Sequence, residues 1–190
     1  MNRLITSLGV IAAALVCIPL AAEDFQPLMT ATRTTWPEKQ HIGVICNYRA
    51  SQPQVMALAK AAGEGALITV VDARIPDEAG AAATLLAKAK ANFVVLMPQD
   101  QVFHDGSFAA TIVVARLAAS GIPATGTTPV ALKQGAVFSV GDGTAGQVLV
   151  NNHLIGTIDV NLPDRSTILQ KSSLVLTREG MATIRVRSAK

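Results

Sequence analysis

The sequence predicts an α/β fold, a three-layer sandwich in which helices cover both faces of a mainly parallel, Rossmann-like sheet, with a β-hairpin at the C-terminus. Two observations lead to this prediction. Runs rich in β-branched residues, such as 41–48 and 67–74, are apolar almost throughout rather than alternating, which is typical of strands buried on both faces. Segments with apolar residues at helical spacing separate these runs, and strands that alternate with helices favour right-handed parallel crossovers.

The central part of the chain supplies the parallel strands and their helices. Strands are predicted at 41–48, 67–74, 92–100, 122–128 and 135–141. The intervening helices are predicted at 53–66, 77–91 and 107–121, and Gly121 ends the last of them. This order of elements is the repeating strand–helix unit of a parallel sheet.

The last third of the chain continues the pattern and then changes it. Apolar residues between Gly146 and Gly156 fall mostly on one side of a helical wheel, which predicts a helix, and 157–163 follows as a strand. Residues 172–186 then predict two strands joined around Arg178, Glu179 and Gly180, which form a loop rather than a tight two-residue turn.

The N-terminus has the layout of a secretory signal peptide. Arg3 precedes an uncharged apolar stretch from Leu4 to Leu20, and Ala21–Ala22 offers a small-residue cleavage site. We therefore expect a periplasmic or secreted protein cleaved near Ala22, with a retained N-terminal anchor as the alternative. The expected organisation is a signal peptide (1–22), an N-terminal extension that packs through Trp36 (23–40), a single α/β domain (41–163), and a C-terminal β-hairpin with a basic tail (164–190).

Composition and charge exclude several functional classes. The net charge of the 190-residue chain is only +3, which predicts neither a nucleic-acid partner nor a trap for acidic substrates. Cys46 is the only cysteine after the signal peptide, so stability is expected to come from a packed core, and its position inside a strand predicts a buried, inert thiol.

Motifs for catalysis or cofactor binding are weak. No serine stands in a G-x-S-x-G motif, and Asp100, His104 and Asp105 lack the spacing of a metal site. Gly141, Gly143 and Gly146 have G-x-G-x-x-G spacing, but a dinucleotide fingerprint belongs to the first strand–turn–helix unit, whereas this one follows the fifth strand. We therefore predict a turn that could hold a small anion, and no enzyme activity, cofactor or metal.

Polar residues gather where the predicted strands end. Because the carboxyl ends of parallel strands meet at one edge of an open sheet, a ligand is expected there. The candidate ligand-binding residues are Asn47, Tyr48, Ser51, Asp72, Gln99, Asp100, Thr127, Gly141, Asp142 and Thr144. The alternative is ordinary turn and helix-cap chemistry, for which Ser51, Asp77, Asp105 and Thr144 are suitable.

Four segments give the chain a family resemblance. They are IGVICNYRASQPQ (42–54), NFVVLMPQD (92–100), ASGIPATGTT (119–128) and ALKQGAVFSVGDGTAGQVLVNNHLIG (131–156). On these segments, Lys39 to Pro163 resembles the second lobe of the periplasmic substrate-binding proteins of ABC importers, particularly the uncharacterised branch related to tryptophan- and tyrosine-type binders. The resemblance implies the inner wall of a ligand cleft, here in a single lobe.

A second resemblance is to single-domain periplasmic proteins that restrain membrane-bound diguanylate cyclases, on Trp36–Pro37 and on VLVN at 148–151. We therefore expect a non-catalytic, single-lobe binding protein, an accessory of a transport system that takes a small polar or amino-acid-like ligand. The alternative is a regulatory or protein-interaction module that acts on a membrane transporter or sensor, with a homodimer as one possible form.

Overall fold

The computed structural model describes residues 24–140, 148–151, 170–176 and 181–188. Among these residues one sheet has the order β6-β5-β4-β3-β1-β2-β8-β7. The strands are β1 His41–Cys46, β2 Leu67–Asp72, β3 Phe93–Val95, β4 Ala124–Gly126, β5 Phe138–Val140, β6 Val148–Val150, β7 Gln170–Leu176 and β8 Met181–Ser188. Strands β1 to β5 are parallel neighbours in the order 2-1-3-4-5, a doubly wound arrangement that changes direction between β1 and β3.

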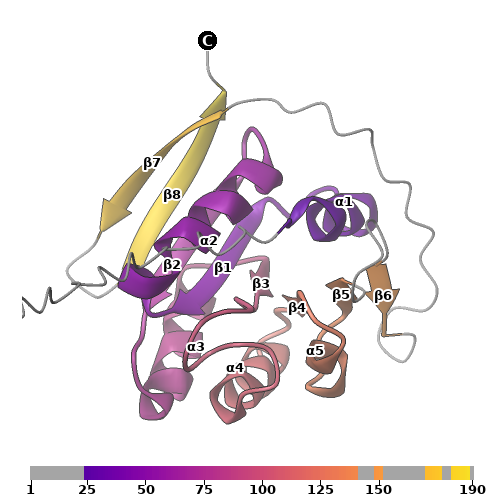
Figure 1. Ribbon diagram of the computed structural model, residues 1–190, viewed down its shortest axis with the longest axis vertical. Helices are drawn as coiled ribbons and strands as arrows, with labels where there is room; N and C mark the ends of the chain where they lie inside the picture. The colour runs from indigo at the N-terminus through magenta and orange to yellow at the C-terminus, as the bar shows by residue number, and fades with distance from the viewer. Residues whose placement is uncertain (1–23, 141–147, 152–169, 177–180, 189–190) are drawn as a thin grey trace, which may run out of the picture.

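Helices cover both faces of this sheet, which confirms the predicted three-layer α/β class (Figure 1). The helices are α1 Gln26–Thr35, α2 Tyr48–Ala62, the 3-10 helix η1 Pro76–Glu78, α3 Ala79–Lys88, α4 Phe108–Ala118 and α5 Val130–Lys133. Helices α1 and α2 pack on one face, and α3, α4 and α5 pack on the other (Figure 1).

The central strands are buried on both sides, as their continuous apolar pattern predicts. In β1, Ile42 and Val44 pack in the core beneath α1 and α2, whereas Ile45 packs beneath α3 and α4. Gly43 faces α3, where an added Cβ would lie 2.9 Å from side-chain atoms of both Leu86 and Val94. Two buried faces therefore explain why hydrophobic residues do not alternate with polar ones along this strand.

The N-terminal extension contains a helix that the sequence pattern did not predict. Helix α1 begins with Pro27 in its first turn, buries Leu28 and Met29 in the core, and is followed by Trp36. The Trp36 ring lies 5.0 Å from the Phe138 ring and 5.9 Å from the Phe93 ring, measured between centroids, so the predicted packing of this residue is confirmed. A ten-residue helix is marginal on its own, and packing against the sheet stabilises it.

The predicted helix after Gly146 is wrong for residues 148–150, which form strand β6. Val148, Leu149 and Val150 pair antiparallel with Val140, Ser139 and Phe138. Without β6, the backbone groups on this side of β5 would be unpaired, and the β-branched residues of 148–150 favour a strand. These residues therefore pair with β5 although their apolar spacing also fits a helix. The predicted strand at 157–163 lies outside the described residues.

The antiparallel pairing of the two predicted C-terminal strands is confirmed, and the structure shows where they dock, whereas the predicted loop at 178–180 lies outside the described residues. Strand β7 pairs antiparallel with β8, and β8 pairs antiparallel with β2, so the hairpin extends the sheet on the side opposite β6. In the described ranges, no helix is both long and apolar enough to cross a membrane. The signal peptide and the four-part division of the chain stay predictions.

Candidate functional site

The carboxyl ends of β1 to β4 meet at one edge of the sheet, and most of the predicted site residues lie there. Asn47 and Tyr48 follow β1, Asp72 ends β2, and Thr127 follows β4. Asp100 belongs to the loop that connects β3 to α4. Gly141, Asp142 and Thr144, and with them the glycine turn, lie outside the described residues.

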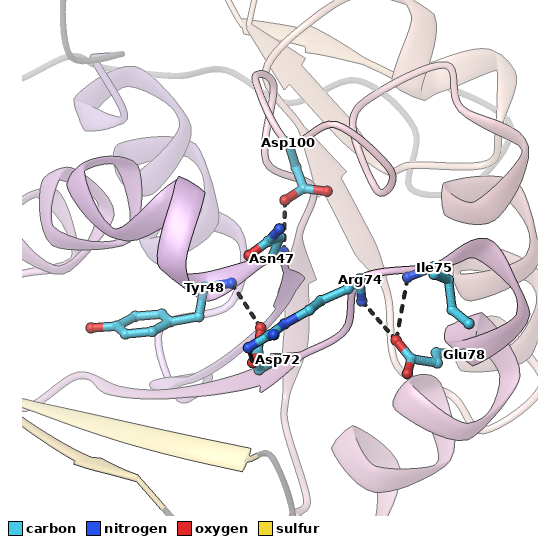
Figure 2. Close-up of polar contacts among 7 residues, drawn as sticks. All are labelled: Asn47, Tyr48, Asp72, Arg74, Ile75, Glu78 and Asp100. Atoms are coloured by element: carbon cyan, nitrogen blue, oxygen red, sulfur yellow. Dashed lines mark hydrogen bonds and ion pairs between the residues drawn. The ribbon is translucent and has the colours of Figure 1, made fainter.

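Asp100 connects the loop after β3 to the residues that follow β1. This residue is only 2% exposed. Oδ2 accepts a hydrogen bond from the Asn47 backbone N–H at 2.8 Å (Figure 2), and a second from the Ser51 hydroxyl at 2.9 Å. Oδ1 accepts from the backbone N–H groups of Val102 at 2.9 Å and Phe103 at 2.7 Å.

This position of Asp100 has a consequence for ligand binding. The crevice at the direction change of a doubly wound sheet, beside a helix N-terminus, is where such folds hold anionic ligand groups. Here the protein's own carboxylate occupies two donors at the start of α2, and Ser51, a possible cap by sequence, lies inside α2 and bonds Asp100. A ligand at this edge must therefore use other groups.

Asp105 makes the corresponding connection to β4. Its Oδ2 accepts from the backbone N–H groups of Thr127 at 2.8 Å and Thr128 at 2.7 Å. The prediction of Asp105 as a helix cap is wrong, because Ser107 caps α4 by accepting from the Ala110 N–H at 3.0 Å. The loop between β3 and α4 is thus hydrogen-bonded to the end of β1 through Asp100 and to the end of β4 through Asp105, and both aspartates are buried. Sequence reasoning missed Asp105 as a site residue because local spacing favours a cap.

Burial raises the pKa of Asp105, and the Thr127 and Thr128 donors only partly oppose this effect. Its Oδ1 is buried and has no hydrogen-bond partner among the residues that the structure describes. Ionisation of Asp105 is therefore less favourable in the folded than in the unfolded protein. The unfolded protein loses the Asp105 proton at about pH 4, whereas the folded protein keeps it until the raised folded pKa. Between these two pKa values, the contribution of Asp105 to the free energy of unfolding falls by about 1.4 kcal/mol for each unit that the pH rises.

We predict that Asp105→Asn removes this pH-dependent loss, because an amide oxygen still accepts from Thr127 and Thr128 but carries no charge. Urea unfolding of both proteins at a series of pH values from about 3.5 upward tests this, with the difference between the two free energies as the readout. The variant is expected to gain stability relative to the parent as pH rises. A difference that is constant over this range would contradict the prediction.

Asp72 and Arg74 form an exposed ion pair at the end of β2 (Figure 2). The Arg74 guanidinium lies 2.8 Å from Asp72 Oδ2, and the Arg74 and Asp72 side chains are 63% and 24% exposed. Asp72 Oδ1 accepts from the Tyr48 backbone N–H at 3.0 Å, which anchors this carboxylate to the start of α2. The interaction with Asp72 raises the pKa of Arg74.

The backbone around Arg74 is held in place by Glu78. The Glu78 carboxylate accepts from the N–H groups of Arg74 at 2.6 Å and Ile75 at 3.3 Å (Figure 2). This contact orders the turn between β2 and η1, so the Arg74 side chain projects from a fixed point. The sequence places Arg74 just after a strand, and only the structure joins it to Asp72 and Tyr48.

The other predicted residues differ in availability. Gln99 is exposed, and its amide oxygen accepts from Gln54 Nε2 at 2.8 Å. The half-buried carboxamide of Asn47 makes no hydrogen bond within the described part of the chain, whereas its backbone N–H is engaged by Asp100. Thr127 is buried and bonded to Asp105. Among the described residues of this edge, Arg74 at the end of β2 and Gln99 are therefore exposed, whereas Asn47 and Asp72 are half-buried.

Two described residues suited to nucleophilic or metal chemistry, Cys46 and His104, are buried or hydrogen-bonded. Cys46 is fully buried, and desolvation, followed by Asp100 and Asp72, raises the pKa of its thiol, which keeps it protonated as predicted for an inert core cysteine. His104 Nδ1 lies 2.7 Å from the Asp105 carbonyl oxygen. The described ranges contain no group of three His, Cys, Asp or Glu residues arranged to hold a metal ion.

No protein-family model matches the chain, and no curated protein matches its sequence. Its fold is similar to part of a conserved domain protein from Vibrio cholerae, at 16% identity and a TM-score of 0.45, over 57% of this chain and 36% of that one. It is also similar to an ABC domain in complex with L-Trp from Streptococcus pneumoniae, at 18% identity and a TM-score of 0.47, over 60% and 38%. The chain thus spans little more than a third of either structure.

Proposed function

We propose that this chain is a non-catalytic binding protein that takes a small polar, amino-acid-like ligand at the carboxyl-end edge of the sheet. The observation that supports this most strongly is the exposed Asp72–Arg74 pair beside the start of α2. Elsewhere on this edge, Asp100 and Asp105 use the neighbouring backbone donors for the fold itself. Within the described part of this edge, Arg74 at the end of β2 is a charged side chain that still faces solvent, with 63% of it exposed.

The chemistry of the pair suits a zwitterion. A guanidinium offers planar, paired donors that match a carboxylate, and an aspartate accepts from an ammonium group. The Arg74 and Asp72 side chains are in contact, so a ligand that carries a carboxylate and an ammonium group close together can reach both. Its carboxylate would pair with Arg74 and its ammonium group with Asp72, and these two ion pairs would replace the present one. Exposed ion pairs contribute little to stability because solvent screens them, so opening this pair for a ligand costs little.

The cellular setting of this proposal rests on the sequence. A signal peptide before residue 23 would deliver the protein to the periplasm or the medium. There we propose that it passes its ligand to a membrane transporter or sensor, as an accessory of a transport system.

Ligand-dependent stabilisation tests the proposal. An amino acid at about 100 times its dissociation constant is expected to add about 2.7 kcal/mol to the free energy of unfolding, seen as a rise in Tm. Arg74→Gln is expected to abolish the rise, whereas Lys60→Gln, an exposed cation near the other end of α2, serves as the matched control and is expected to keep it. No rise with any amino acid, or an equal rise in both variants, would contradict the proposed site.

Phe108 supports a second candidate, a protein-interaction module. Its side chain is 77% exposed at the first turn of α4, and Val130 is 44% exposed at the start of α5. Exposed large apolar residues often mark protein contacts when they are contiguous. Light scattering after size-exclusion chromatography distinguishes the two candidates. A protein-interaction module is expected to self-associate or to co-purify with a partner. Phe108→Ser is expected to remove that association and to leave amino-acid binding unaffected.

A further inference from the structure

A cavity of about 270 Å³ lies at the opposite end of the sheet from the Asp72–Arg74 pair. It is bounded by α1, by residues 37–40, by the start of β1 and by the segment from the end of α2 to Ala66. Helix α2 runs from Tyr48 at the carboxyl-end edge to Ala62 at this cavity. Because its 15 residues span about 22 Å, the two places cannot share one small ligand.

Part of the cavity wall is apolar and comes from the core. Met29 of α1, Ile42 of β1 and Ala62 of α2 are buried, with exposed fractions of 3%, 1% and 6%. Ala66, which precedes β2, is also buried. A ligand placed against these side chains would keep its apolar surface away from water, which is the main source of affinity in small-molecule pockets.

Two cations complete the wall. The Arg33 guanidinium donates to the carbonyl oxygens of Met29 at 3.1 Å and Ala61 at 3.0 Å, and it has no carboxylate within ion-pair distance among the residues the structure describes. The Lys39 ammonium group lies 3.4 Å from the Asn92 carbonyl oxygen and 5.6 Å from the centroid of the Trp36 ring. Both cations are therefore held by neutral groups.

The balance of charge around the cavity favours an anion. Glu64 is exposed and also lines the cavity, but across the described ranges it forms no ion pair with Arg33 or Lys39. Arg33 is an exposed residue, and partial desolvation lowers the pKa of its guanidinium, an effect that a negative group beside it would oppose. A carboxylate matches the donors of both cations.

We propose that this cavity binds a small monocarboxylate with an apolar body, such as an aromatic or short aliphatic acid, with the carboxylate beside Arg33 and Lys39 and the apolar body against Met29, Ile42 and Ala62. This site is independent of the proposed amino-acid site. Its volume lies just below the range of about 300–1,000 Å³ that is usual for ligand pockets, so only a small ligand fits and large lipids are excluded.

The experiment titrates the full chain with benzoate and hexanoate, and with benzamide and hexanamide as neutral analogues of the same shape. The readouts are the emission of Trp36, the only tryptophan of the chain, and the amide resonances of Ile42 and Ala62. Saturable changes are expected with at least one acid, and the matching amide is expected to bind about tenfold or more weakly because it lacks the charge.

Three variants locate the binding. Lys39→Gln removes one cation and leaves the Arg33 contacts intact, and Ala62→Leu fills the cavity; each is expected to weaken acid binding about tenfold or more. Arg74→Gln at the other end of α2 is the control and is expected to bind the acids as the parent does, even if it no longer binds amino acids. An unfolding curve checks that Ala62→Leu is folded. If it is not folded, the test rests on the affinity of Lys39→Gln relative to the parent and on the affinity of each acid relative to its amide.

Several results would overturn the proposal. These are the absence of a saturable response to either acid, equal affinity for acid and amide, or unchanged acid binding in Lys39→Gln. Acid binding that is lost in Arg74→Gln but kept in Ala62→Leu would assign the acids to the carboxyl-end edge instead. Failure of amino-acid binding alone would overturn the proposed function and leave this site standing.

Discussion

Asp100→Ala is expected to lower the free energy of unfolding by about 3–5 kcal/mol, since hydrogen bonds to a charged group are each worth roughly 1.5–3 kcal/mol and several are lost together. The backbone N–H groups of Asn47, Val102 and Phe103 and the Ser51 hydroxyl all lose their acceptor at a site that is 2% exposed. Urea unfolding followed by circular dichroism measures the loss.

Added formate or acetate tests the cause of that loss. If a missing carboxylate is responsible, formate is expected to raise the Tm of Asp100→Ala more than that of the parent, because it can occupy the space left at the start of α2. Asp77→Ala, which removes an exposed aspartate of η1, is the control and is expected to change stability by no more than about 0.5 kcal/mol. A loss below about 1 kcal/mol in Asp100→Ala would contradict a role of this carboxylate in connecting the loop after β3 to the start of α2.

Phe138→Ala is expected to cost about 3–5 kcal/mol, because it leaves a cavity between the sheet and the N-terminal segment. Phe138 is fully buried in β5 and its ring centroid lies 5.0 Å from that of Trp36. The loss of this contact is expected to shift the Trp36 emission to longer wavelength in the folded protein, which reports a wetter environment.

A matched control separates burial from side-chain chemistry in this case. Phe108→Ala makes the same substitution at a side chain that is 77% exposed, and it is expected to change stability by less than about 0.5 kcal/mol and to leave Trp36 emission unchanged. Similar stability losses in the two variants would contradict the effect of burial. An unshifted Trp36 spectrum in Phe138→Ala would show that the environment of Trp36 does not depend on the Phe138 contact.

The elements with strong internal patterns were predictable from the sequence. Strands β1 and β2 are apolar because both faces are buried, and α2, α3 and α4 carry the helical spacing of their core contacts. The weaker elements were not. Helix α1 is stabilised by contacts with residues far away in the chain, such as the Arg33 bond to the Ala61 carbonyl oxygen, and a local pattern does not report those.

The same distinction applies to the site. Polar residues after each strand predict one shared edge, because parallel strands end together, and the structure places Asn47, Asp72, Asp100 and Thr127 there. Which of them stay available could not be predicted, because Asp100 and Asp105 satisfy donors from strands that are distant in sequence. The availability of a polar group depends on the partners it finds in three dimensions.

The sequence by itself determined the layer architecture, the parallel core and the C-terminal hairpin, because hydrophobic periodicity and turn residues act within a few positions of one another. Only the tertiary structure decided that 148–150 pairs with β5 as a strand, that Asp100 bonds the start of α2, and that Arg74 remains exposed beside a half-buried Asp72. The physical reason is that backbone edges, buried carboxylates and helix ends take whichever partners the folded chain brings within hydrogen-bonding distance.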